Sequence, residues 1–378
     1  MLVTAKRILA LAAAVPLLAG LAGAANAAPA PTPAEILQAG AQAGLKDGYP
    51  AVIGMVRNGN STQYIQAGSA DRVKGTPADP KMKFRIGSNT KAFTATVLLQ
   101  LEAEHKLSLD DTVARWLPGA VNANGNDGTK ITLRQLLTHT SGIPDYASNV
   151  QFGLTYAGNL NPSLQWAPQT LVNLGTSSKP VAAPGAKYSY SNTNYVLAGM
   201  VIKAVTGNDP AVEIQHRIIE PLGLHDTTFP ASDPAMPANS LNGYFIALGV
   251  YRDVTASQVQ AFGSAGAIVS TLDDLATFER ALLTGKLLQP VQEQELKTTV
   301  PMDATSGNGY GLGIGHAQTP CGPVWTHTGA VLGYLSQWIT SDDGSKQMVF
   351  AVNEFHMIEG TPGQTDVGTA ALNAYCAL

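Results

Sequence analysis

The sequence has 378 residues but only two cysteines, and only 13% of its residues are charged. The net charge of −4 and the absence of a basic stripe argue against nucleic acid as a partner. The sequence also lacks the H-E-x-x-H and C-x-x-C spacings of metal sites and the glycine-rich fingerprints of nucleotide sites. We therefore expect no metal and no cofactor, and the missing G-x-S-x-G elbow argues against an α/β-hydrolase.

One long apolar run occurs, close to the N-terminus. Lys6 and Arg7 precede the run ILALAAAVPLLAGLAG, and Ala25-Asn26-Ala27 has the small-x-small form that a signal peptidase accepts. The run is short for a membrane anchor, and no second apolar run of spanning length follows it. We predict a signal peptide at 1–27, a proline-rich leader at 28–33 and a secreted or periplasmic product without a membrane span.

The two cysteines, Cys321 and Cys376, both lie in the part that export would deliver to an oxidising compartment. An even number of cysteines in such a compartment favours a disulfide over two free thiols. The bridge would stabilise the fold by about 3–4 kcal/mol on the chain-entropy estimate.

Segments with strand character lie near both ends of the sequence, and helical segments lie between them. Alternating apolar and polar residues around Asn58-Gly59 predict a β-hairpin. Other predicted elements are helices at 34–44, about 88–105 and 271–285, strand-like runs at 309–318, 323–341 and 346–355, and a last helix at about 365–375.

This order predicts an α+β fold with one antiparallel sheet that is built from both termini and flanked by helices. We assign residues 34–108 and 262–378 to an α/β domain and residues 109–261 to a mostly helical inserted domain. The cleft between the two domains is the expected site.

A serine and a lysine lie three residues apart in the segment FRIGSNTKAF. Ser88 and Lys91 would share one face at the start of a helix, where free backbone N–H groups favour an oxyanion. The apolar turns after Lys91 predict burial, which lowers a lysine pKa from its usual value of about 10.4 and lets the amine accept the serine proton. The alternative is a serine N-cap with a lysine that reaches solvent.

A second group, Tyr190, Ser191 and Asn192, precedes an apolar helix. A phenol beside an ammonium group can shuttle a proton, and an amide can hold a substrate carbonyl. The alternative is a tyrosine-rich helix entry in which Asn192 is a cap.

A third group, His327, Thr328 and Gly329, lies in a strand-like run. The glycine permits a close approach of a ligand to the backbone, and the histidine could position the Tyr190 or Lys91 side of the site. A structural histidine is the alternative.

In this order, the three groups resemble the penicillin-recognising serine hydrolases. The pairing of Tyr-Ser-Asn with His-Thr-Gly is similar to the branch that holds exported D-alanyl-D-alanine carboxypeptidases, class C β-lactamases, D-aminopeptidases and related esterases. The resemblance covers nearly the whole mature chain, through LLTHTSGIPDY, YSYSNTNYVLAGM, SAGAIVST, YGLG and HTGAVLGY. YSYSNTN and the cysteine pair look closest to an exported D,D-carboxypeptidase.

The resemblance implies a mechanism. Ser88 attacks an acyl carbon and forms an acyl-enzyme, while Lys91 and Tyr190 share the proton transfers. Asn192 holds the substrate amide, and the backbone N–H groups of Ser88 and Ala330 form the oxyanion hole.

Two positions depart from the carboxypeptidases that this pattern resembles. Gly315 stands where those enzymes carry an arginine that helps to hold the substrate's terminal carboxylate, and Ala330 stands where they carry a threonine. A lost charge-assisted hydrogen bond costs about 1.5–3 kcal/mol, although Thr328 and His316 could compensate. By the same comparison, His139 in LTHTSG is structural.

We therefore expect a serine acyl-hydrolase that acts on D-alanyl peptides of peptidoglycan type and binds β-lactams, with a D-alanyl-D-alanine carboxypeptidase as the first hypothesis. An esterase, a D-amino-acid peptide hydrolase or a β-lactamase on the same site is the alternative. A non-catalytic binding protein on this scaffold is the third hypothesis. The expected partners are a small peptide or ester substrate and a β-lactam.

Overall fold

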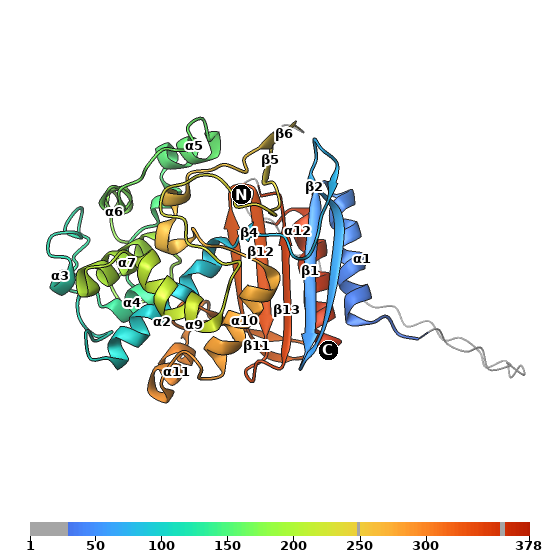
Figure 1. Cartoon of the computed structure of the whole chain (residues 1–378). Coiled ribbons are helices and arrows are strands. Elements are labelled where there is room, and N and C mark those ends of the chain that lie inside the picture. The colour runs from blue at the N-terminus through green and yellow to red at the C-terminus, as the bar shows by residue number, and fades with distance from the viewer. Residues whose placement is uncertain (1–28, 248–249, 356–359) are drawn as a thin grey trace, which may run out of the picture. The chain divides into compact units, whose positions relative to one another are not determined.

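The computed structural model describes residues 29–247, 250–355 and 360–378 (Figure 1). Residues Thr32–Leu378 form one compact unit. The predicted signal peptide at 1–27 lies outside the described residues. Within the described part of the chain, we find no helix that is long and apolar enough to cross a membrane.

A nine-stranded sheet lies at the centre of the unit Thr32–Leu378, with the order β3-β2-β1-β13-β12-β11-β10-β9-β8. Strands from the two ends of the chain meet in the antiparallel pair β1–β13, where Val52 lies opposite Val352. This arrangement confirms the predicted antiparallel sheet built from both termini. The strands of the large sheet are β1 (Ala51–Asn58), β2 (Ser61–Asp71), β3 (Thr76–Pro77), β8 (Val300–Pro301), β9 (Gly309–Tyr310), β10 (Gly315–Thr319), β11 (Gly322–Val331), β12 (Tyr334–Thr340) and β13 (Lys346–Val352). Two small two-stranded pairs are β4 (Phe84–Arg85) with β7 (Val269–Ser270), and β5 (Tyr244–Ala247) with β6 (Val250–Asp253).

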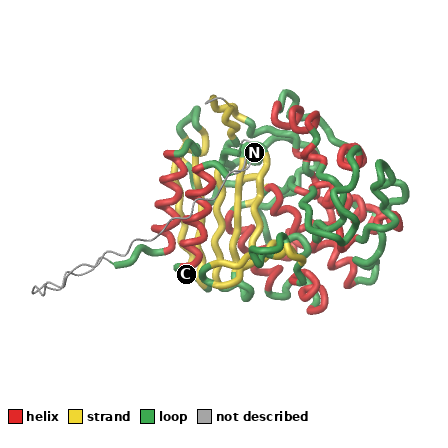
Figure 2. The backbone as a smooth tube through the Cα atoms, turned by 180° about the vertical axis from the view of Figure 1, so that it is seen from behind, coloured by secondary structure: helices red, strands yellow, loops and turns green. Residues whose placement is uncertain are grey.

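The central strands are buried on both faces because helices cover both faces of the sheet. In β1, Val52 belongs to a cluster with α1 (Pro33–Lys46) and α12 (Pro362–Cys376), whereas Ile53 belongs to the larger core. Successive side chains of a strand point to opposite faces, so a strand buried on both sides needs a continuous apolar run. Figure 2 shows α1 and α12 side by side across one face of the sheet.

The larger core, on the other face, contains helix α2 (Thr90–Ala103). Its residues 90–99 are all buried, and among them Thr90, Lys91, Thr94 and Thr96 are polar or charged. Lys91 lies inside this buried stretch. The other α-helices of four residues or more are α3 (Val113–Trp116), α4 (Leu133–Leu137), α5 (Val150–Gly158), α6 (Pro168–Thr176), α7 (Asn192–Thr206), α8 (Pro210–Ile214), α10 (Leu272–Leu283) and α11 (Pro290–Lys297). A five-residue π-helix, Gln215–Ile219, joins α8 to the single turn α9 (Glu220–Leu222).

The structure corrects the predicted elements in two places. The runs 309–318 and 323–341 each break into two strands, because Gly313 and Gly333 adopt positive φ angles of 87° and 86° and turn the chain. The segment 109–261, predicted as mostly helical, also contains the β5–β6 hairpin. The boundaries between an α/β domain and an inserted helical domain stay a prediction.

Candidate active site

Ser88 lies in a 3-10 turn, Gly87–Asn89, that joins strand β4 to helix α2. Gly87 has a φ of 53°, and a Cβ at this position would stand 2.6 Å from the backbone nitrogen of Ala330. A residue with a side chain cannot adopt this φ at such a close approach without strain. The glycine therefore lets the turn that carries Ser88 lie directly against the segment of β11 that carries Ala330.

The Lys91 amine is fully buried and lies among three oxygen atoms. Its Nζ is 3.0 Å from Ser88 Oγ, 2.8 Å from Asn192 Oδ1 and 2.8 Å from the carbonyl oxygen of Ala265. Burial lowers the pKa of Lys91 to about 7, although the Asp145 carboxylate acts in the opposite direction. A large share of the amine is therefore neutral at neutral pH.

The partners of Lys91 fix the direction of its lone pair. A carbonyl oxygen only accepts hydrogen bonds, so the Ala265 carbonyl and the Asn192 amide oxygen each take one N–H of the amine. A neutral amine has two N–H groups and one lone pair, and Ser88 Oγ is its third partner. In the neutral state the lone pair therefore points at the serine hydroxyl, which is the geometry of a general base.

Tyr190 reaches the same serine from the loop before α7. Its hydroxyl donates to Ser88 Oγ at 2.7 Å, and the centroid of its ring is 4.8 Å from Lys91 Nζ. The three residues Ser88, Lys91 and Tyr190 thus lie within hydrogen-bond reach of one oxygen atom, Ser88 Oγ. That oxygen has a potential base on one side and a potential proton donor on the other.

Asp145 is a residue of this site that the sequence analysis missed. Its Oδ1 accepts from the backbone N–H of Asn192 at 3.0 Å and of Ala147 at 3.1 Å, and its Oδ2 accepts from Asn192 Nδ2 at 3.0 Å. Burial raises the pKa of Asp145 above its ordinary value, although these hydrogen bonds and Lys91 act in the opposite direction. The segment LLTHTSGIPDY includes Asp145, but no spacing rule links Asp145 to Asn192, which lies 47 positions later at the start of helix α7.

His327 and Gly329 lie on β11, next to the serine turn. His327 Nδ1 is 2.7 Å from the carbonyl oxygen of Thr328, so Nδ1 carries the proton, and Nε2 accepts from the Tyr310 hydroxyl at 2.9 Å. Burial, with a smaller contribution from Lys91, lowers the pKa of His327 to about 3, so the ring is neutral. A Cβ on Gly329 would stand 1.9 Å from a backbone carbonyl oxygen just before the serine turn, so this close packing requires glycine.

His139 lies behind Tyr190, and the centroids of the two rings are 4.3 Å apart. The backbone N–H of Ser191 donates to its Nδ1 at 3.1 Å, and that of Ser189 donates to its carbonyl oxygen at 2.8 Å. Burial lowers the pKa of His139 well below its ordinary value, so the ring adds no charge to the site. These contacts hold the loop that carries Tyr190.

A pocket of about 680 Å³ lies beside Ser88. Gly315 and His316 of β10 and Thr328 of β11 line it together with the serine. Among the described residues that line the pocket, none is a lysine or arginine, and Asp145 is the one carboxylate. The large apolar and aromatic side chains of the lining are Tyr188, Tyr190, Phe262, Met302, Tyr310 and Phe355.

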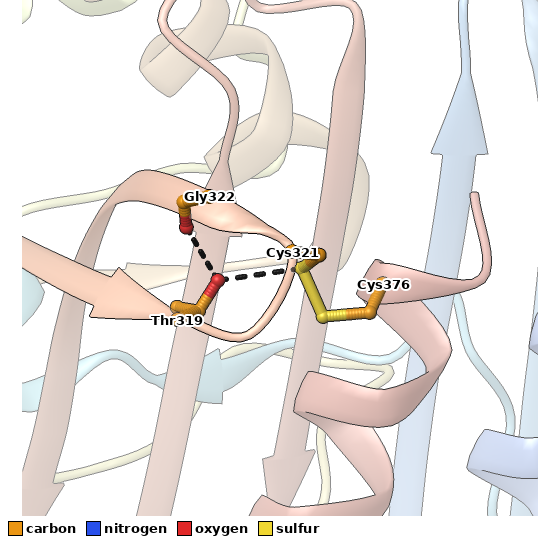
Figure 3. Close-up of a disulfide and its surroundings, with 4 residues drawn as sticks. All are labelled: Thr319, Cys321, Gly322 and Cys376. Carbon is orange, nitrogen blue, oxygen red and sulfur yellow. Dashed lines mark hydrogen bonds between the residues drawn. A yellow bond between two sulfur atoms is a disulfide. The ribbon is translucent and has the colours of Figure 1, made fainter.

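Cys321 and Cys376 form the predicted disulfide, with their Cα atoms 5.4 Å apart. The bridge ties the turn between β10 and β11 to the end of α12, and the Thr319 hydroxyl lies 3.3 Å from Cys321 Sγ (Figure 3). The β10–β11 hairpin, which also lines the pocket, is thereby fixed to the outer helix layer.

The fold and the site define the class of protein, a serine hydrolase of the β-lactamase and penicillin-binding protein type. The family model described as beta-lactamase matches residues 35–371, and the chain belongs to this family.

Three proteins that are similar to this chain illustrate the class. The solved structure of a D-stereospecific amidohydrolase from Streptomyces sp. is 38% identical with a TM-score of 0.83, over 89% of this chain and 98% of that one. Penicillin-binding protein 4* of Bacillus subtilis (strain 168) is 25% identical over 82% of this chain and 69% of that protein. Protein flp of Staphylococcus aureus (strain MW2) is 36% identical over 47% of this chain, and the match spans only 34% of flp.

Proposed function

We propose that the protein hydrolyses its substrate through an acyl-enzyme on Ser88, with Lys91 as the general base. The observation that best supports this role is the set of three oxygen partners that aims the Lys91 lone pair at the serine hydroxyl. As Ser88 Oγ attacks the acyl carbon, its proton passes to Lys91 Nζ. The backbone N–H groups of Ser88 and Ala330 stabilise the negative charge on the acyl oxygen.

Tyr190 completes the proton path. Its hydroxyl, 2.7 Å from Ser88 Oγ, gives a proton to the leaving amine and is reprotonated from the Lys91 ammonium. Water then enters where the amine left, and the same groups return a proton to Ser88 as the acid product forms.

For the substrate, we propose amides and short peptides with a D-amino acid on the acyl side. No lysine or arginine lies among the described residues of the pocket lining, so an amine without a carboxylate suits this pocket as the leaving group. The aromatic lining suits an apolar acyl side chain. The similarity to a D-stereospecific amidohydrolase supports the D configuration.

A D-alanyl-D-alanine carboxypeptidase that binds β-lactams is the second candidate. His316 and the exposed Thr328 line the pocket and can donate hydrogen bonds to a terminal carboxylate. They would replace the arginine that similar carboxypeptidases carry at the position of Gly315. The similarity to a penicillin-binding protein also supports it.

We also propose that the protein is exported. The apolar N-terminal run with its small-x-small site and the disulfide Cys321–Cys376 both support an oxidising compartment.

The experiment compares five probes on the wild-type protein and on Ser88→Ala. The probes are D-alanine p-nitroanilide, its L enantiomer, a peptide that ends in D-Ala-D-Ala, a p-nitrophenyl ester, and benzylpenicillin followed by intact-protein mass spectrometry. We expect D-anilide turnover to exceed L-anilide turnover. It should also exceed D-alanine release from the peptide by at least about tenfold, which corresponds to one charge-assisted hydrogen bond to the terminal carboxylate. Ser88→Ala should abolish turnover and the penicilloyl adduct.

Other outcomes select the alternatives. Faster D-alanine release with a stable penicillin adduct would mean a carboxypeptidase, and consumption of penicillin without an adduct would mean a β-lactamase. Turnover of p-nitrophenyl esters alone would mean an esterase. A protein that is acylated by none of these probes would be a binding protein.

A further inference from the structure

We propose that Asp145 is a positioning residue of this site, which fixes the Asn192 amide with its oxygen toward Lys91. The inference rests on the proposed role of Lys91 as the base and deepens it. Asp145 acts through Asn192, and its proposed role requires no direct contact between Asp145 and Ser88.

The contacts of Asp145 leave one orientation for the Asn192 side chain. An asparagine amide can be reversed by exchange of its oxygen and nitrogen ends. An ionised carboxylate only accepts, so only the amide nitrogen can face Asp145, at the 3.0 Å that separates Nδ2 from Oδ2. The carboxylate is held in turn by the backbone N–H groups of Asn192 and Ala147.

The reversed amide would disable the base. The Asn192 N–H₂ would then face Lys91, and the amine lone pair would accept from it. Both N–H groups of the amine would turn to the Ala265 carbonyl and to Ser88 Oγ. Lys91 would donate to the serine hydroxyl instead of accepting from it, and could not take the serine proton.

Asp145 also supplies charge near the amine. Its carboxylate raises the pKa of Lys91 against the larger lowering by burial. Both histidines near the amine are held neutral by burial, so they do not offset the loss of the Asp145 charge. The ionisable groups that face Lys91 are Asp145, Tyr190, Tyr195, His139 and His327.

The first test is the pH profile of kcat and kcat/KM for Asp145→Asn with D-alanine p-nitroanilide. The two backbone N–H groups keep the oxygen of the new amide at the place of Oδ1. The N–H₂ group of the new amide therefore takes the place of Oδ2, where it faces the Asn192 N–H₂ group, and two donors meet without an acceptor. Asn192 then favours the reversed orientation. We expect the plateau value of kcat to fall at least about tenfold and the acid limb to move to lower pH.

The second test is the exchange variant, Asp145→Asn combined with Asn192→Asp. The amide at 145 then donates to a carboxylate at 192, whose other oxygen accepts from Lys91, so donors and acceptors match again. We expect kcat to recover at least about tenfold over Asp145→Asn. The acid limb should lie at higher pH than in the wild type, because the carboxylate now touches the amine.

Asp111→Asn is the matched control. Asp111 also holds a loop, since its Oδ2 accepts from the Ser108 backbone N–H and the Trp116 indole N–H, each at 3.0 Å, and it is not among the residues that line the pocket. The Asp111→Asn variant should have the kcat of the wild type, and the acid limb of its pH profile should lie at the same pH. Thermal unfolding of every variant shows that the fold is intact at the assay temperature.

Two results would overturn the inference: an Asp145→Asn variant with unchanged kcat and acid limb, or an exchange variant no more active than Asp145→Asn. Failure of the proposed function is distinguishable, because the wild-type protein itself would then show no serine acylation and no anilide turnover.

Discussion

The pocket is bounded by two regions that are built differently. In the proton-transfer group, the polar atoms contact one another: Ser88 Oγ meets both Lys91 Nζ and the Tyr190 hydroxyl, and Asn192 bridges Lys91 to Asp145. On the β10–β11 wall, Gly315 and Ala330 are small, and Thr328 is exposed. The proton-transfer group comprises Ser88, Lys91, Tyr190, Asn192 and Asp145, and the β10–β11 wall comprises Gly315, His316, Thr328 and Ala330.

This difference separates the chemistry from the choice of substrate. A change at one member of the proton-transfer group leaves a buried partner without its hydrogen bond, so each change affects the others. A change on the β10–β11 wall alters what the pocket can hold and leaves the proton path intact. We therefore expect large losses of turnover from the first region and shifts of specificity from the second.

The largest expected effect comes from Ser88→Ala and Lys91→Met. Each should lower kcat/KM with D-alanine p-nitroanilide by about 10⁴-fold or more, because the proposed nucleophile or its proposed base is lost. The double variant should be no worse than either single variant, since the two residues act as one unit. Additive losses would show that the two residues act independently, which would contradict the interdependence of the proton-transfer group.

Tyr190→Phe should have the next largest effect. Lys91 can still take the serine proton, but the leaving amine loses its proton donor, so we expect a loss of about 10²-fold in kcat. Tyr188→Phe is the matched control, because Tyr188 lines the same pocket and no role in proton transfer is proposed for it. Equal losses in the two variants would indicate a general effect of the aromatic lining.

The pH profile sharpens the comparison further. In the proposed mechanism, the active form of Lys91 is the neutral amine. Burial lowers its pKa to about 7, so kcat/KM should rise with pH through 7 and then level off. Below pH 7 we expect a loss of about tenfold for each pH unit. His327, with a pKa lowered to about 3, cannot produce this limb. A profile that is flat from pH 5 to 8 would contradict the assignment of Lys91 as the base.

The sequence predicted the overall architecture because alternation and apolar runs reflect burial directly. The hairpin β1–β2 and the burial of Lys91 followed from such patterns. The breaks at Gly313 and Gly333 were missed because a glycine within an apolar run does not reveal its φ angle.

Parts of the site could not be predicted from the sequence. The Ala265 carbonyl that binds Lys91 is a backbone group, which any residue type would supply equally. The contact of Asp145 with Asn192 joins a loop to the start of helix α7, 47 residues later, and only the tertiary fold brings the two together. The position Gly315 was found through the family resemblance, and the structure places it on the pocket wall.

The smallest expected effect, and the one that tests the β10–β11 wall, comes from Gly315→Arg. Gly315 does not have a positive φ, and a Cβ there would stand 3.1 Å from the Thr326 carbonyl oxygen, so a side chain needs only a small shift. The guanidinium would offer the cation that the pocket lining lacks. We expect kcat/KM for a D-Ala-D-Ala peptide, relative to D-alanine p-nitroanilide, to rise about tenfold. Gly315→Ala adds the same crowding without the charge and should leave the ratio unchanged. If both variants change the ratio equally, crowding rather than charge decides, and the carboxylate argument for this wall is wrong.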